Sequence, residues 1–254
     1  MTTTAQEIET ALLAEVAAIA AAVRDGSWRS GEISSDAPDQ LGSTENPMSG
    51  LSSSGLDWMT QFVSFLEEPL NELRGNPDPM SSGATGYSDA GTDVSGTADD
   101  YRKSTETDTD GWTGDAASGY RQSGSQYADG LSALGEGSST VAGAISGAAE
   151  VVGQVVGIVT GLVAEAIGRI VPIMTQAVAA APVTFGQSIA AAIPQCVQIA
   201  VDYGQRIAGQ LAALLSSGEN LLKLVEGALA VMDVAKQVLS AISSQGTTGQ
   251  EVSA

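Results

Sequence analysis

One tryptophan between two glycines, in the segment Asp110–Gly114, most constrains how this chain folds, because one helical pattern ends there and another begins. After it, larger apolar residues recur at steps of three, four or seven: Trp112, Ala116, Tyr120, Tyr127, Leu131 and Leu134. Before it, Tyr87, Val94, Ala98 and Tyr101 follow the same spacing. The pattern predicts two antiparallel helices that pack through these stripes and are joined by a glycine turn.

The residue types around the tryptophan suit such a turn. Gly111 can take the positive φ that ends a helix, while Thr113 and Asp115 carry side-chain oxygens that can cap the next helix. Trp112 has two readings at this stage. It is either a side chain presented at the turn or a buried core residue at a bend.

The segment from Trp112 to Arg121, with helical arms on both sides, resembles the WxG-motif family of helical-hairpin proteins exported by type VII secretion systems of actinobacteria. Two flanking stretches, Ala21–Trp28 and Glu68–Asp78, resemble a longer actinobacterial variety of that family with an alanine- and glycine-rich helical tail. The resemblance is strongest from about 56 to 140 and looser elsewhere.

The resemblance implies that Trp112 and Gly114 form part of an export signal read by a secretion ATPase or chaperone. It also implies pairing through the hairpin, as a homo- or hetero-oligomer, and secretion without a cleaved signal peptide after a cytoplasmic stage. The chain departs from the family at the Tyr-x-x-x-Asp/Glu tail of that signal: Gly124, Leu131 and Ile207 stand four residues after Tyr120, Tyr127 and Tyr203. Either a partner supplies the tail, or this chain is not itself the exported member.

Charge narrows the classes of partner. The net charge is −20, and residues 1–110 hold 20 acidic and 5 basic side chains. Phosphate backbones repel such a chain, so we expect no nucleic-acid partner. Met1–Leu13 contains two glutamates, and no lysine or arginine precedes Arg24, which is the wrong charge order for a general secretory signal.

Residues that carry chemistry are scarce. The chain has no histidine and one cysteine, Cys196, so a catalytic triad, a Cys-His pair or a His-bearing zinc site is excluded. Glu106, Asp108 and Asp110 resemble the start of a calcium loop, but Ala117 stands at the twelfth position, where a bidentate glutamate is required. We therefore expect no enzyme activity, no metal and no cofactor.

Periodicity and composition divide the chain into consecutive segments. A helix is predicted in 1–25 and a flexible Ser/Gly-rich linker in 26–55, with Trp28 either anchoring that linker or exposed. The predicted segments are 1–25, 26–55, 56–140 (the hairpin region, led by a helix from Leu56 to Arg74 that Pro69 kinks or breaks), 141–244 (an apolar helical region) and 245–254 (a disordered tail).

The apolar region should begin with a long helix that continues the second hairpin arm. Prolines at 172, 182 and 194 should divide the following stretch into shorter helices, and Ser216–Glu219 has the form of a capping box before a closing helix. The predicted fold class is therefore all-α: a helical hairpin with a WxG turn that continues into an elongated helical bundle.

Gly153, Gly157 and Gly161 form two overlapping GxxxG steps, a pattern that lets another helix backbone approach closely. Three uses remain open: packing within one chain, self-association, or membrane insertion. Three hypotheses for the function of the chain also stay open: a secretion-associated recognition module, a merely structural oligomer, and a membrane-active or pore-forming protein using residues 141–201. Only 14 uncharged residues separate Glu150 from Glu165, fewer than the roughly 20 of a spanning helix.

Overall fold

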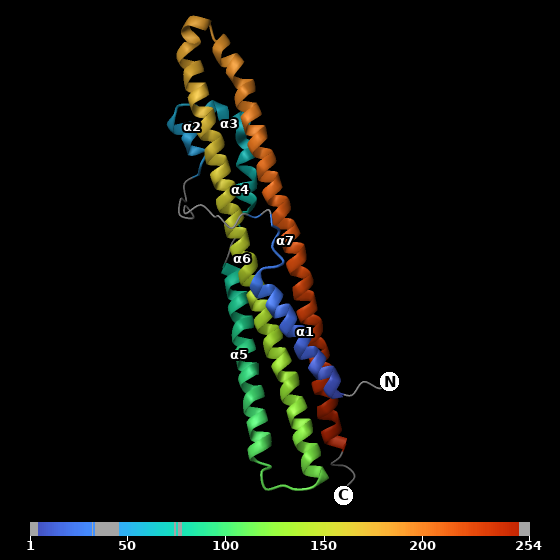
Figure 1. Cartoon of the computed structure of the whole chain (residues 1–254). Helices are drawn as coiled ribbons and strands as arrows, with labels where there is room; N and C mark the ends of the chain where they lie inside the picture. The colour runs from blue at the N-terminus through green and yellow to red at the C-terminus, as the bar shows by residue number, and fades with distance from the viewer. Residues whose placement is uncertain (1–4, 32, 34–45, 74, 76–77, 249–254) are drawn as a thin grey trace. The chain divides into compact units, whose positions relative to one another are not determined.

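The computed structural model describes residues 5–31, 33, 46–73, 75 and 78–248. These residues form seven α-helices and two short 3-10 helices, and they contain no β-strand, so the predicted all-α class is confirmed (Figure 1). The helices are α1 (Ala5–Asp25), α2 (Ser49–Ser53), α3 (Thr60–Val63), α4 (Glu68–Leu73), α5 (Asp78–Thr107), α6 (Asp115–Thr184) and α7 (Gln187–Thr248); the 3-10 helices are Asp57–Met59 and Ser64–Leu66.

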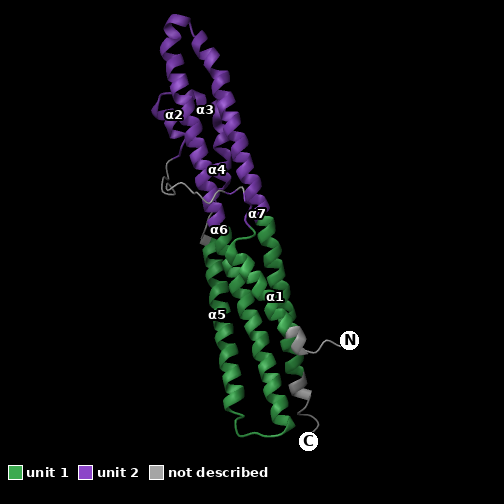
Figure 2. Ribbon diagram, viewed as in Figure 1, with its two compact units in different colours: residues 1–28, 77–148, 218–254 green, residues 29–76, 149–217 purple. Residues whose placement is uncertain are grey.

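The chain forms two compact units that are discontinuous in sequence (Figure 2). Unit 1 consists of residues 1–28, 77–148 and 218–254, and unit 2 of residues 29–76 and 149–217. The long helices α6 and α7 contribute to both units. The predicted hairpin region 56–140 is therefore divided, because 56–73 packs in unit 2 while the hairpin itself belongs to unit 1.

Unit 1 packs α1, α5 and parts of α6 and α7 together. Leu12 and Val16 of α1 form an apolar cluster with Val231 of α7. Trp28 anchors the residues that follow α1: its side chain is buried, and its indole nitrogen donates a hydrogen bond to the Val23 carbonyl at 3.2 Å. The anchoring alternative for Trp28 is thus the one observed.

Unit 2 holds the larger core, which joins the 48–70 segment to α6 and α7. Its fully buried large side chains include Leu51, Met59, Leu66, Leu70, Ile170, Met174 and Ile207. The apolar stripe predicted for 56–74 is buried, but the helix is broken between Val63 and Glu68 rather than at Pro69. Pro69 lies in the first turn of α4, where a missing backbone N–H costs little.

The predicted linker 26–55 contains structure. Residues 49–53 form α2, and Leu51 is fully buried in the core of unit 2. Residues 34–45, the middle of that linker, lie outside the described residues. The predicted tail also begins too early, since α7 continues to Thr248; residues 249–254 fall outside the described part.

The prolines do not divide the long helices. Pro172 and Pro182 lie inside α6 and Pro194 inside α7, and the chain turns instead at Phe185 and Gly186. A proline deprives the carbonyl four residues earlier of its partner, and here those carbonyls belong to Gly168, Val178 and Ala190. All three residues are exposed, so water can take the place of the missing amide.

The predicted capping box is also wrong. Residues 216–219 lie inside α7, and Ser217 is fully buried. Its hydroxyl donates to the Ala213 carbonyl at 2.8 Å and accepts the Ser30 amide at 2.9 Å. The serine therefore holds the chain after α1 against α7, and starts no helix.

Candidate functional site at the hairpin turn

The segment that joins α5 to α6 is a tight turn with Trp112 on it. The Trp112 amide donates to the Thr109 carbonyl at 2.9 Å, and the Ser118 amide donates to the Gly114 carbonyl at 3.2 Å. Gly114, rather than Gly111, takes the positive φ, at +92°. A side chain at Gly114 would strain this backbone, which explains the glycine of the motif.

Arg121 ties the turn to the second arm. Its Nε donates to the Thr109 hydroxyl at 2.8 Å, and its Nη2 donates to the Trp112 carbonyl at 3.0 Å and to the Thr109 carbonyl. Thr109 is buried, and its hydroxyl donates in turn to the Thr105 carbonyl at 2.6 Å. Sequence reasoning did not assign a role to Arg121, although it lies one helical turn and a half after the start of α6.

Trp112 is presented to solvent. Its side chain is 54% exposed, which removes the alternative of a buried core residue at a bend. The indole stacks against Tyr120, with the ring centroids 5.7 Å apart and the planes at 49°. Because Arg121 fixes the backbone and Tyr120 supports the ring, the exposed aromatic surface is held in one place.

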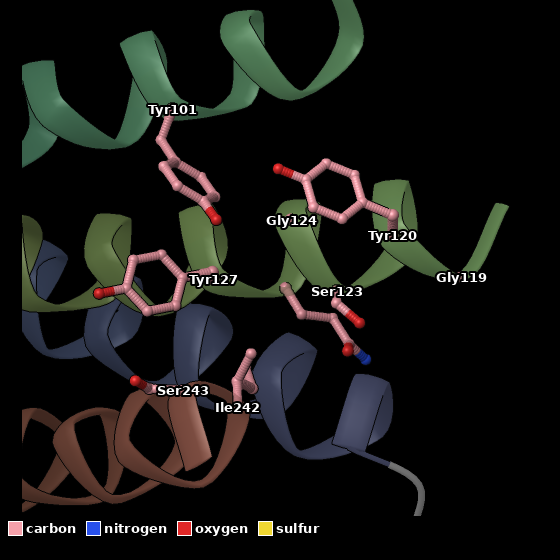
Figure 3. Close-up of a pocket in the computed structure, with 9 residues that line it drawn as sticks. Tyr101, Gly119, Tyr120, Ser123, Gly124, Tyr127, Ile242 and Ser243 are labelled. Atoms are coloured by element: carbon pink, nitrogen blue, oxygen red, sulfur yellow. The ribbon is translucent and has the colours of Figure 1, made fainter. Parts of the chain in front are cut away.

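A cavity of about 540 Å³ lies beside this turn, lined by residues of α5, α6 and the end of α7. Its lining includes Tyr101, Tyr120, Tyr127 and Ile242, and Figure 3 shows Tyr101 on α5 facing the helix α6 that carries Tyr120 and Tyr127. The rings of Tyr101 and Tyr127 are 5.0 Å apart. We call Tyr101, Trp112, Tyr120 and Tyr127 the aromatic tip.

Tyr101 holds its phenolic proton more strongly than an ordinary tyrosine. Burial, and then the neighbouring phenols of Tyr120 and Tyr127, raise the pKa of Tyr101 above its ordinary value. Tyr101 therefore presents a neutral hydroxyl group and a ring face. A cluster of aromatic side chains can contact a partner through its ring faces and hydrogen-bond through its hydroxyl groups.

The predicted stripes pack the two arms together only in part: Tyr101 and Tyr127 meet across the arms, and Ala98 is buried. The arms meet through small residues: a Cβ added to Gly135 would lie 2.9 Å from the Gly91 carbonyl, and one added to Gly91 would lie 2.8 Å from the Gly135 carbonyl. Ala98, Ala117 and Ala128 are buried along the same arms. The close approach at Gly91 and Gly135 leaves no room for a large side chain there, and the rings of Tyr101 and Tyr127 meet elsewhere along the arms.

Two of the glycines predicted for close helix packing, Gly153 and Gly161, do not lie at a close helix contact. A Cβ built at Gly153 or at Gly161 meets no atom within 4 Å. Gly157 is half-buried. At Gly153 and Gly161 the reading of close packing within one chain therefore fails, and the readings of self-association and membrane insertion are untouched.

No group of three or more potential metal ligands occurs among the described residues. Of the residues that resemble the start of a calcium loop, Glu106 lies in α5, and the Asp108 carboxylate accepts a hydrogen bond from the Ser104 hydroxyl at 2.6 Å. Cys196 is buried in unit 2, and burial raises the pKa of its thiol, which disfavours the reactive thiolate.

One polar cluster lies in unit 2 on α6 and α7. Arg169 and Arg206 lie over the Tyr203 ring at 5.6 and 4.9 Å from its centroid, and Arg169 donates to Glu165 at 2.8 Å. The Tyr203 hydroxyl, and then Arg169, hold the pKa of Glu165 below its usual value. Arg169 pairs with Glu165 on α6 and lies over the Tyr203 ring of α7, so this cluster joins two helices.

By length and composition alone, one helix in the described part of the chain, α6, could cross a membrane. Its most apolar stretch is 33% buried within the protein. A core helix of a soluble protein meets the same criteria, so this finding is weak by itself.

The chain was also compared with known proteins. A scan against protein-family models finds no matching family, and searches of curated proteins and of solved structures find no similar protein.

Proposed function

We propose that this chain is a non-enzymatic, secretion-associated protein that acts through recognition of its helical hairpin, as a substrate or partner of a type VII secretion system. The observation that supports this most is Trp112, which is 54% exposed on the turn between two antiparallel helices. An exposed tryptophan that is held rigidly is typical of a binding hot spot.

The support of the turn favours recognition over an accidental exposure. Arg121 binds the carbonyl groups of Thr109 and Trp112, and Tyr120 stacks on the indole, so the side chain is ordered before any partner arrives. Ordering in advance reduces the entropy lost on binding. Trp112 itself contributes little to the core, since more than half of its side chain is exposed.

The hairpin is already covered in part by its own chain. Leu12 and Val16 of α1 pack on α7, and Ile242 of α7 lines the cavity beside Tyr101 and Tyr120. The surface left for pairing in this proposal is the aromatic tip, whose Trp112 and Tyr120 are 54% and 49% exposed. In this proposal a partner binds there and supplies the Tyr-x-x-x-Asp/Glu tail that this chain lacks.

The experiment compares secretion of the full chain with that of Trp112→Ala in a host that has an intact type VII system. We expect the ratio of secreted to cellular protein to fall at least about tenfold, because removing a hot-spot residue costs about 2 kcal/mol or more of binding. The matched control is Trp58→Ala, which removes a tryptophan that is 37% exposed in unit 2. Equal secretion of Trp112→Ala and the unchanged chain would refute the proposal.

A further inference from the structure

The α6–α7 tip, residues 178–191, is the most exposed apolar part of the described chain. None of its side chains is buried. Phe185 is 96% exposed and Val183 is 82% exposed, although each is a residue type that proteins normally remove from water.

The backbone holds Phe185 in an unfavourable conformation. Its φ is +53°, in the left-handed region that a bulky side chain rarely adopts. Gly186 follows at φ +84°, and its amide donates to the Ala181 carbonyl at 3.1 Å, which closes the end of α6. Strain of this kind persists where a position has a function, and here it directs an aromatic ring outward.

The tip is also free of charge. From 170 to 201 no residue is acidic or basic, in a chain whose net charge is −20. The turn between α5 and α6 makes the contrast, since Asp108, Asp110 and Asp115 surround it. A tip that served only as a solvated turn would carry polar or charged residues in the same way.

Two of the polar side chains near Phe185, Thr184 and Ser188, have hydrogen-bond partners inside the protein, whereas Gln187 is exposed. The Thr184 hydroxyl donates to the Ala180 carbonyl at 3.0 Å and lies 2.9 Å from the Ser188 hydroxyl. Ser188 donates to the Ala177 carbonyl at 2.7 Å, and its amide donates to Thr184 at 3.3 Å. Groups that have partners inside the protein can enter an apolar medium without losing hydrogen bonds to water.

We propose that the α6–α7 tip inserts into the interfacial layer of a lipid bilayer with electrically neutral headgroups, with Phe185 and Val183 as the inserted side chains. A lipid surface is the occupant because exposed Val183 and Phe185 stand at the end of an uncharged stretch from 170 to 201, and the Thr184 and Ser188 hydroxyls have partners inside the protein. Anionic lipid is disfavoured, since it repels a chain of net charge −20.

The length of the uncharged arms favours insertion over spanning. Each arm has 16 uncharged residues, 170–185 and 186–201, and so a height of about 24 Å at the rise of an α-helix. The hydrocarbon core of a bilayer is about 30 Å thick. The tip therefore reaches into the membrane surface without crossing it.

The test is flotation of the full chain with phosphatidylcholine vesicles. We expect the unchanged chain to float with the vesicles and Phe185→Asn to float at least about tenfold less, because the ring supplies much of the apolar area. Asparagine tolerates a positive φ, so this variant keeps the fold, which circular dichroism verifies. The control is Leu215→Asn, which removes an apolar side chain that is 69% exposed on α7 outside the tip and should float like the unchanged chain.

The two proposals fail separately. The secretion assay of Trp112→Ala tests only the hairpin, and the flotation assay of Phe185→Asn tests only the tip. The lipid proposal is overturned if the unchanged chain remains unbound, or if Phe185→Asn floats equally well. It is also overturned if Phe185→Asn instead abolishes a dimer measured by light scattering without lipid, because the tip would then bind a second copy.

Discussion

At the scale of single residues, the environment of a glycine decides what it does. Gly91 and Gly135 permit the arms of the hairpin to touch, whereas Gly96 and Gly153 face open space. The GxxxG spacing singles out Gly153, which faces open space, and does not include Gly91 and Gly135, which lie at the contact. Only the rotation of one helix against the other distinguishes these glycines, and that rotation is set by contacts distant in sequence.

The first prediction compares two substitutions on α5. Gly91→Ala should lower the free energy of unfolding by about 1–3 kcal/mol, because the new methyl group would overlap the Gly135 carbonyl and Ser139 backbone. Gly96→Ala should raise it by about 0.5–1 kcal/mol, since alanine is the better helix former and meets no neighbour. Urea unfolding of both variants measures the difference. Equal effects would mean that the arms do not meet at Gly91.

At the scale of elements, periodicity predicts the helices well and their ends poorly. Apolar residues at steps of three, four or seven along α6, among them Val155, Val159, Ala166 and Ile170, are buried. The long helix continues the second arm as expected. Helix propensity is a local property, so the sequence predicts a break at each proline. The break falls instead at Phe185 and Gly186, where the sequence carries only a weak signal.

The candidate site was predictable in part. The motif places Trp112 on the turn, and Tyr101 and Tyr127 of the predicted stripes meet across the arms. The close approach at Gly91 and Gly135 does not follow from those stripes. Arg121 was missed, since its role depends on the fold-back of the chain onto Thr109. Residues whose partners lie across a turn give no periodic signal.

The second prediction concerns a proline inside α6. Pro172 is exposed, and the carbonyl that it leaves without an amide belongs to exposed Gly168. Pro172→Ala should therefore raise the free energy of unfolding by about 1–3 kcal/mol, because it restores one helical hydrogen bond and removes a steric conflict without loss of packing. Urea denaturation again provides the measurement. A destabilised variant would indicate that unit 2 requires the proline's effect on helix geometry.

At the scale of the whole molecule, two discontinuous units share two long helices. The order of elements could be predicted, but the units could not. The spacing of apolar residues along α7 does not indicate which part of the helix packs with α1 and which part packs with the 48–70 segment. The aromatic tip lies in unit 1 and the α6–α7 tip in unit 2, so each surface can be altered without changing the other unit's sequence.

The most direct test of the central claim, that Trp112 is a recognition residue, is the affinity of the full chain for the secretion ATPase or chaperone, measured by titration calorimetry. The account predicts that Trp112→Ala binds at least about tenfold more weakly, while Trp58→Ala binds like the unchanged chain and all three unfold at similar urea concentrations. Equal affinities for Trp112→Ala and the unchanged chain would contradict it.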